Sequence, residues 1–343
     1  MTSPNSDPLR PLHAPSSALP DMNAFPIDPD KPWLAPLAGF SDLPFRLLCR
    51  EHGCAVAVTE MVSAKGLLYE SPGTADLLRT CPADAPLAVQ LFGSEESFLV
   101  RAVERLREAG YTHFDLNCGC SVRKVVKTGS GAALLREPEH LPRLAGALIK
   151  AAPPGGMGFK IRLGWNQPVY LRLGAELEAL GAGWIAMHPR FGSQGFTGNA
   201  DWKHLERLKN AVGIPVIASG DLFSAEDAAR CVDQTGVDGV MFARGALNDP
   251  EIFSRYLSLR RSEVPEPKTP GQTLALVRRL CQLYAEYGMD RPGLLKMRTL
   301  VPRFLKGLPG AREIRRDIVF CTTWDQVFDT LDKHFHGREE QWS

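Results

Sequence analysis

Between residues 33 and 253, short apolar runs alternate with amphipathic stretches, and this pattern constrains the fold more than any other feature. Amphipathic stretches such as 97–109, 169–180 and 225–235 are each followed by a glycine, as helices often are. Such alternation predicts right-handed βαβ units and a parallel sheet. Eight units in about 220 residues match a (β/α)8 barrel, with an open doubly wound sheet as the alternative. The predicted strands are 33–37, 55–59, 87–91, 113–116, 158–161, 184–187, 215–218 and 239–242.

The chain differs in composition on either side of this region. Residues 1–32 contain eight prolines and no apolar signal-peptide core, which predicts a flexible arm. Residues 261–270 are polar and proline-rich, as linkers are. Up to four helical segments follow without a convincing strand, at 273–287, 293–305, 311–319 and 324–335. We therefore expect an α/β protein: a (β/α)8 TIM barrel over 33–260, a linker over 261–270, and a smaller all-helical domain over 271–343.

A net charge of +1 conceals a strongly basic segment in the predicted helical domain. From Arg291 to Arg316 the sequence has eight Lys and Arg residues and one acid, Glu313. The segment therefore carries a net charge of +7, which leaves −6 for the rest of the chain. Charge gathered in this way indicates a nucleic-acid partner. No apolar run approaches the roughly 20 residues that cross a bilayer, so we expect no membrane partner. Eight cysteines without a disulfide framework predict a cytoplasmic protein.

Polar residues gather at the C-terminal ends of the predicted strands, where barrel enzymes carry their active sites. A single polar residue at a strand end is ordinary, but six such ends predict an organised pocket. These residues are Gln90, Asn117 with Cys120, Lys160 with Arg162, His188 with Arg190, Ser219 to Asp221, and Ala243 to Gly245.

The last two strand ends indicate the type of ligand. Gly220 and Gly245 lie in turns that open helices, where free backbone N–H groups bind anions. Arg244 adds a guanidinium that can bind phosphate. The alternative is that these glycines only permit tight turns. No Gly-x-Gly-x-x-Gly follows a strand, so the sequence does not support a Rossmann dinucleotide site.

Two side chains in this set are chemically reactive. Lys160 is predicted to be the last inward residue of its strand, and a buried lysine requires an anionic ligand or a neighbouring acid. Cys120 lies in a loop rich in glycine and cationic residues, which suits a nucleophile or a proton donor. The pair Cys118 and Cys120 has no second pair at zinc or iron–sulfur spacing, so we expect no metal.

In this order, the motifs resemble those of the tRNA-dihydrouridine synthases, and most closely the bacterial B-type branch. The resemblance extends from residue 33 to about residue 335 and includes one motif of the helical domain. The similar segments are 34–46, 115–125, 129–132, 160–164, 188–190 with Gln194, 198–202, 217–221, 238–245 and 306–312.

The resemblance implies a role for each matching residue. It implies FMN held by Pro36, Leu37, Ala38, Gln90, Lys160, His188, Ser219, Gly220, Asp221, Ala243 and Arg244. It implies Cys120 as the catalytic acid and a substrate site of Asn117, Arg190, Lys124 and Arg162. Separately, the charge of the basic segment predicts tRNA contacts from Lys296, Arg298, Arg303, Lys306, Arg312, Arg315 and Arg316. Four residues depart from the family pattern: Ser121 for proline, Leu37 for methionine, Ser219 for asparagine and Ala243 for glycine.

The implied reaction reduces specific uridines of tRNA to 5,6-dihydrouridine. NADPH or NADH would reduce FMN, FMN would give hydride to C6, and Cys120 would give the proton to C5. The uridine must leave the tRNA stack, and phosphate contacts from the basic segment would offset that cost. One alternative is an FMN oxidoreductase acting on a free pyrimidine, like the dihydroorotate dehydrogenases, and another is a non-catalytic RNA-binding barrel. We expect a monomer.

Overall fold

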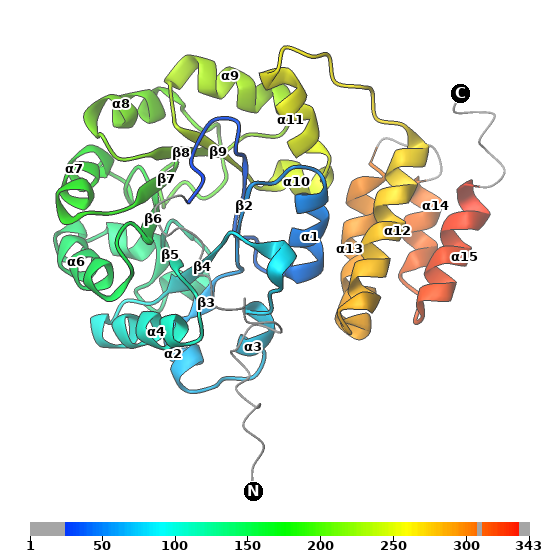
Figure 1. Cartoon of the computed structure of the whole chain (residues 1–343), viewed down its shortest axis with the longest axis horizontal. Helices are drawn as coiled ribbons and strands as arrows, with labels where there is room; N and C mark the ends of the chain where they lie inside the picture. Colours follow the sequence, from blue (N-terminus) through cyan, green and yellow to red (C-terminus); the bar gives the residue numbers. More distant parts are fainter. Residues whose placement is uncertain (1–24, 307–310, 336–343) are drawn as a thin grey trace, which may run out of the picture.

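The computed structural model describes residues 25–306 and 311–335, and within these residues the central sheet is a closed parallel barrel. β1 pairs with β2 on one side and β9 on the other, which closes the sheet (Figure 1). β2 and β3 both pair with β4, so together they occupy one of eight positions around the barrel. The strands are β1 (Trp33–Leu34), β2 (Val56–Val58), β3 (Val62–Ser63), β4 (Leu87–Phe92), β5 (His113–Cys118), β6 (Met157–Arg162), β7 (Trp184–His188), β8 (Val216–Ser219) and β9 (Gly239–Phe242).

Helices surround this barrel, so the predicted fold class is confirmed. Helix α9 shows why the sequence forms a helix there: Ser224 and Asp227 make a capping box at its start, and Gly236 ends it at φ +63°. Each predicted strand is present with its ends shifted by no more than three residues, and β3 is the addition. The surrounding helices are α1 (Leu43–Glu51), α2 (Ala64–Leu68), α3 (Thr74–Leu77), α4 (Glu96–Glu108), α5 (Arg123–Val126), α6 (Leu141–Ala151), α7 (Tyr170–Leu180), α8 (Lys203–Ala211), α9 (Ala225–Thr235), α10 (Arg244–Asn248) and α11 (Ile252–Arg260).

Aromatic rings fill the end of the barrel where the strands begin. Phe25 stacks on His113 and on Trp184, with ring centroids 3.9 and 5.0 Å apart. The Trp184 indole occupies the space over Gly158, where an added Cβ would lie 1.9 Å from the indole. Because the described residues pack this end closely, the open end of the barrel is the one where the strands end.

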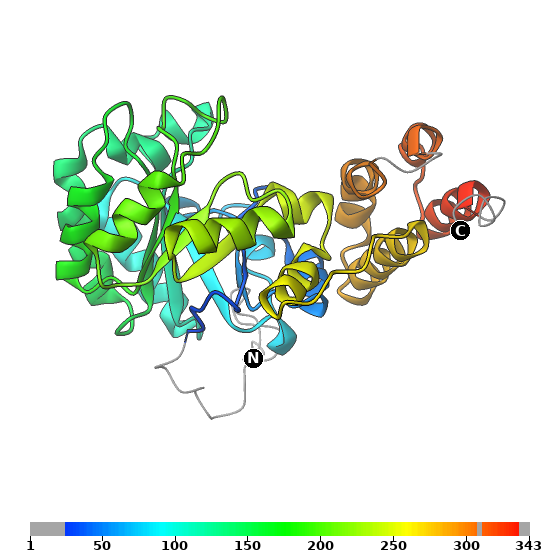
Figure 2. The ribbon, with the colours of Figure 1, turned by 90° about the horizontal axis from the view of Figure 1, so that it is seen from above.

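Four helices follow the barrel and form the predicted helical domain beside it: α12 (Pro270–Glu286), α13 (Asp290–Phe304), α14 (Ala311–Ile318) and α15 (Trp324–Phe335). Thr269 and Gln272 form a capping box at the start of α12. α12 packs against α1 and α13 packs against α10, so the domain lies along one side of the barrel (Figures 1 and 2). Most of the predicted arm and the end of the predicted helical domain lie outside the described residues. None of the described helices combines the length and apolarity that a membrane crossing requires.

Candidate active site

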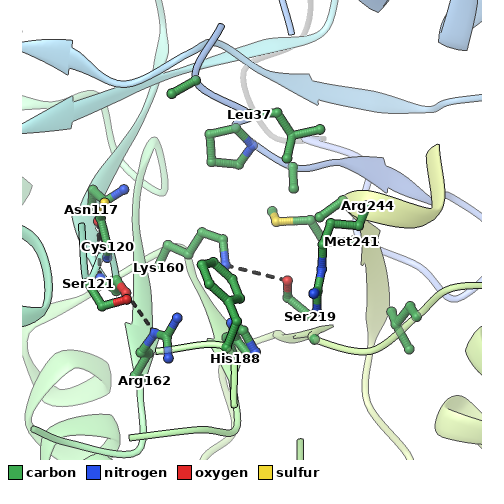
Figure 3. Close-up of a pocket in the computed structure, with 18 of the residues that line it drawn as sticks. Leu37, Asn117, Cys120, Ser121, Lys160, Arg162, His188, Ser219, Met241 and Arg244 are labelled. Carbon is green, nitrogen blue, oxygen red and sulfur yellow. Dashed lines mark hydrogen bonds between the residues drawn. The ribbon is translucent and has the colours of Figure 1, made fainter. Parts of the chain in front are cut away.

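A pocket opens at the C-terminal ends of the strands, and the structure gathers most of the predicted site residues around it (Figure 3). On one side are Asn117 and Cys120, and on the other are Met241 and Arg244. Of the residues predicted to hold FMN, the pocket is lined by Pro36, Leu37, Ala38, Lys160, His188, Ser219, Gly220, Asp221, Ala243 and Arg244. Of the predicted substrate residues, it is lined by Asn117 and Arg162, with Cys120 beside them.

Lys160 points from β6 into the middle of this pocket, with its Nζ atom 3.4 Å from Ser219 Oγ (Figure 3). Burial lowers the pKa of Lys160 to about 8, and the buried carboxylate of Asp115 on β5 opposes that shift. A neighbouring acid was one of the two partners expected for this lysine, and Asp115 is that acid. An anionic ligand in the pocket would stabilise the charged lysine further.

A chain of hydrogen bonds fixes the backbone of the Cys120 loop. Asn117 Oδ1 accepts from the backbone N–H groups of Gly119 (3.1 Å) and Cys120 (2.8 Å). Asn117 Nδ2 donates to Gln90 Oε1 at 2.7 Å, and Gln90 Nε2 donates to Asp115 Oδ2 at 2.6 Å. These hydrogen bonds use the side-chain amide of Asn117 to hold the loop, and they leave the Cys120 thiol partly open to the pocket.

Cys118 and Cys120 are separated by one residue but lie in different environments. Cys118 is fully buried, and burial raises the pKa of its thiol well above the ordinary value. A buried thiol that resists ionisation behaves as a small core residue. Cys120 is the cysteine of this pair that lines the pocket.

Three residues predicted to bind ligand do not line the pocket. Gln90 is 0% exposed beneath it, within the hydrogen-bond chain above. Arg190 is buried and binds both carboxylate oxygens of Asp221, at 2.6 and 2.9 Å, and also His188 Nε2 at 2.9 Å. Lys124 is exposed on α5. The structure therefore gives Gln90 and Arg190 contacts within the protein, and their predicted ligand contacts remain predictions.

Arg162 lines the pocket and also holds the loop after β7. Its Nε donates to the Gly119 carbonyl at 2.7 Å, and its Nη1 donates to the carbonyls of Phe191 and Gly195 at 3.0 and 2.6 Å. Burial, together with the charge of Arg190, lowers the pKa of Arg162 to about 10. The guanidinium thus joins the Cys120 loop to the loop that carries Phe196.

The turn after β8 requires an unusual backbone. Gly220 has φ +103°, and an added Cβ would lie 2.4 Å from His188 Cδ2. Burial, followed by the nearby charges of Lys160 and the arginines, lowers the pKa of His188 to about 2, so the imidazole is neutral. Arg244 Nη2 lies 3.1 Å from Asp221 Oδ1. Glycine, neutral histidine and a partly exposed guanidinium make this wall suitable for a phosphate group.

The sequence interpretation missed several lining residues, among them Met61, Phe196, Phe223 and Met241. Phe196 and Phe223 are 58% and 47% exposed, and the Arg244 guanidinium lies 5.2 and 4.7 Å from their ring centroids. Gly195 and Gly198, both at positive φ, flank Phe196 closely. An aromatic residue between glycines in a loop after a strand could have indicated Phe196 as a lining residue. Nothing in the sequence indicates Met61 or Met241.

The chain matches the family described as dihydrouridine synthase (Dus) over residues 33–338. It is 34% identical over 291 residues to tRNA-dihydrouridine synthase B of Pseudomonas aeruginosa, covering 84% of this chain and 87% of that protein. It is 32% identical over 306 residues to the probable tRNA-dihydrouridine synthase 1 of Synechocystis, covering 87% of this chain and 84% of that protein.

The chain belongs to the dihydrouridine synthase family. The resemblance seen in its motifs is therefore confirmed. Among solved structures, morphinone reductase aligns with 70% of this chain and 88% of its own, at 12% identity and a TM-score of 0.48.

The residues predicted to contact tRNA divide into two groups. Lys296 binds Asp42 of the barrel, with Nζ 2.6 Å from Oδ2, and Arg298 donates to the Cys321 carbonyl at 3.4 Å. The other five are exposed: Arg303, Lys306, Arg312, Arg315 and Arg316. Arg316 also pairs with Asp317, and Arg303 lies over the Phe40 ring, but both stay exposed. Because the five are exposed, whereas Lys296 and Arg298 are partly buried against their partners, the five form the better candidate surface for tRNA.

Among the described residues, no group of three or more His, Cys, Asp or Glu side chains is arranged to hold a metal ion. All eight cysteines are described and free.

Proposed function

We propose that this chain reduces specific uridines of tRNA to 5,6-dihydrouridine, with FMN in the barrel pocket and NADPH or NADH as the reductant. One observation carries the proposal: in a chain of this family, a partly exposed thiol, a buried lysine and an anion-suited turn line the same pocket. The free thiols of all eight cysteines support a cytoplasmic site of action.

The lining of the pocket fits FMN in three respects. Leu37, Ala38 and Met241 offer apolar surface to a flat ring system. Lys160 offers a cation whose pKa burial lowers to about 8, and an anionic group in the pocket would stabilise its charged form further. The turn at Gly220 and the guanidinium of Arg244 are suited to the phosphate. Pro36, His188, Ser219, Asp221 and Ala243 complete the set of lining residues that would hold the cofactor.

The protein's own residues must place the uracil and supply a proton. When bound and reduced, FMN would supply the hydride that C6 accepts, and NADPH or NADH would reduce the oxidised FMN again. Hydride addition at C6 leaves negative charge between C5 and the C4 carbonyl oxygen. Cys120 would donate its Sγ proton to C5, because it is the cysteine whose thiol lines the pocket. Arg162 lies beside it and offers a positive charge toward the developing negative charge.

The substrate's size explains the helical domain. A uridine stacked within a folded tRNA must be extruded to enter a barrel, which costs a few kcal/mol. Contacts between lysine or arginine and phosphate offset such a cost and release counterions. Exposed residues of the helical domain would make such contacts: Arg303, Lys306, Arg312, Arg315 and Arg316. A free pyrimidine as substrate would give these residues no role.

The proposal is tested by incubating the FMN-loaded protein and NADPH with unmodified tRNA and, separately, with free uridine and orotate. We expect mass spectrometry to show a gain of two hydrogens at particular tRNA uridines and no product from the free pyrimidines. Product from a free pyrimidine with none from tRNA would contradict the proposal and favour the dihydroorotate-dehydrogenase-like alternative.

A further inference from the structure

Lys296 of the helical domain lies between two carboxylates of the barrel. Its Nζ atom is 2.6 Å from Asp42 Oδ2 and 3.6 Å from Glu60 Oε1. Asp42 and Glu60 are 4% and 7% exposed, and the Lys296 side chain is 20% exposed. Two buried carboxylates near each other require a compensating cation, and Lys296 provides it. This lysine therefore joins the two domains through charge.

The two carboxylates hold the loop between β1 and α1, which lines the pocket. Glu60 Oε2 accepts a hydrogen bond from the backbone N–H of Gly39, whose φ is +81°. Asp42 caps α1 at the other end of the loop, where its Oδ1 accepts from Phe45 N at 3.3 Å. Leu37 and Ala38, which precede Gly39, line the pocket, as does Met61, which follows Glu60.

Other residues of the helical domain support the same wall. Tyr284 OH donates to Asp42 at 3.0 Å from Oδ2, and the Arg303 guanidinium lies 5.4 Å from the ring centroid of Phe40. Helix α13 also packs against α10, the helix that Arg244 begins. The helical domain thus backs two walls of the pocket, one at the β1–α1 loop and one at α10.

We propose that Lys296 is a positioning residue for the cofactor: through Glu60 and Asp42, it holds the 37–41 loop in the shape that receives FMN. The helical domain is then part of the cofactor site as well as the surface for tRNA. The inference rests on the proposed function, because it requires FMN to bind in this pocket. It also separates Lys296 from the exposed basic residues of the same domain.

The position of Lys296 predicts the consequences of its removal. Without its ammonium, the two buried carboxylates lose the cation that contacts both of them, and the charge of the buried Arg46, which is also paired with Asp84, remains as partial compensation. Glu60 is then expected to take up a proton or turn toward solvent. Either change weakens the acceptor for Gly39 N–H and loosens the loop. Removing the charge of Glu60 as well leaves one buried carboxylate, Asp42, in place of two that repel each other. A glutamine oxygen at position 60 can still accept the hydrogen bond from Gly39 N–H. If Lys296 acted only through the packing of its aliphatic stem, the second substitution would not restore FMN binding.

The test measures FMN dissociation constants by quenching of flavin fluorescence on the full-length apoprotein, and tRNA dissociation constants by filter binding. We expect Lys296→Met to weaken FMN binding by about tenfold or more. We expect Lys296→Met/Glu60→Gln to recover most of that loss, and Lys296→Arg to bind FMN almost as the wild type does. Lys306→Met is the matched control, and it should weaken tRNA binding while FMN binding stays unchanged.

Glu60→Ala keeps the Lys296–Asp42 pair but removes the acceptor for Gly39, so it tests the inference even if Lys296→Met does not fold. We expect it also to weaken FMN binding. A wild-type chain that binds no FMN would contradict the proposed function itself. Wild-type FMN binding together with unchanged dissociation constants in Lys296→Met, or in Glu60→Ala, would overturn this inference alone.

Discussion

The cationic residues of the barrel mouth and those of the helical domain differ in how their charge is engaged. In the mouth, Arg190 binds Asp221 and Arg162 binds three backbone carbonyls. On the helical domain, Arg312 and Arg315 are exposed. Arg190 and Arg162 thus hold loops in a fixed shape, whereas Arg312 and Arg315 on the helical surface are exposed to a partner.

Lys296 shows that the division follows contacts and not position in the sequence. It lies within the basic segment, yet it belongs with the mouth because it binds Asp42 and Glu60. Charge that is buried and paired shapes a site, while exposed charge attracts a polyanion. Substitutions in the two groups should therefore separate chemistry and cofactor binding from tRNA binding.

The largest effect is expected at the thiol. Cys120→Ala should lower dihydrouridine formation by about 10²- to 10⁴-fold, because a general acid contributes that much to a proton transfer. FMN binding and NADPH oxidation should stay near the wild-type level, as measured by flavin absorbance and by loss of NADPH. Cys118→Ala is the matched control, because its buried thiol lies outside the pocket. Normal product formation by Cys120→Ala would assign the proton to another residue.

The next effect is expected at a buried ion pair of the mouth. Arg190→Met removes two of the hydrogen bonds of the Asp221 carboxylate and leaves those from Ala200 N and Arg244, and the broken buried ion pair costs about 3 kcal/mol of the unfolding free energy. Urea denaturation measures that loss, and FMN affinity should fall with it because Asp221 lines the pocket. Arg143→Met, in an exposed ion pair with Glu96, should leave both quantities unchanged. Equal stability of the two variants would mean that the mouth does not depend on its paired arginines.

A smaller and different effect is expected on the helical surface. Arg312→Gln/Arg315→Gln/Arg316→Gln should weaken tRNA binding about tenfold at moderate salt and leave FMN affinity unchanged. The slope of log Kd against log salt should fall by about 2 to 3, at roughly 0.7–0.9 for each phosphate that the protein no longer neutralises. Arg298→Gln removes a cation that is bound to the Cys321 carbonyl, so it should change the slope little. The comparison breaks down if Arg298→Gln changes the salt dependence as much as the triple variant does.

The smallest effect is expected from pH. The pKa of Lys160 is lowered by burial to about 8, so the lysine loses its proton as pH rises through that value. The protonated form attracts an anionic flavin, and FMN affinity should therefore decrease severalfold between pH 7 and pH 9, by roughly the attraction of one charge. His188, with a pKa lowered to about 2, stays neutral throughout and adds nothing. Fluorescence titration should show this decrease of FMN affinity with pH in the wild type and not in Lys160→Met. The same decrease in both proteins would assign the pH dependence to another group.

Much of the barrel and its pocket could be predicted, because both follow from local sequence. Strand ends carry their residue types in order along the chain, so Lys160, His188 and Ser219 could be assigned to one face without coordinates. Gly220 could be assigned to a turn for the same reason. The motif around Cys120 indicated the thiol, and its partial exposure in the pocket agrees with that.

The partners of each charge could not be predicted, because they come from distant parts of the chain. Lys296 meets Asp42 across 254 positions, and no spacing rule connects them. Arg190 follows β7 and Asp221 follows β8. Both terminal nitrogens of the Arg190 guanidinium donate to the Asp221 carboxylate. Gln90 is enclosed by Asp115 and Asn117 for a similar reason. A motif gives the residue type that a site requires, but the fold decides which of its atoms remain available to a ligand.

The most direct measurement of the central claim mixes NADPH-reduced, FMN-loaded protein with unmodified tRNA in the absence of oxygen. If the pocket passes electrons to a tRNA uridine, the flavin absorbance band will return, and dihydrouridine will form in equal amount to the flavin oxidised. The Cys120→Ala protein should regain the band far more slowly. A wild-type flavin that stays reduced in the presence of tRNA, with no dihydrouridine formed, would contradict the account.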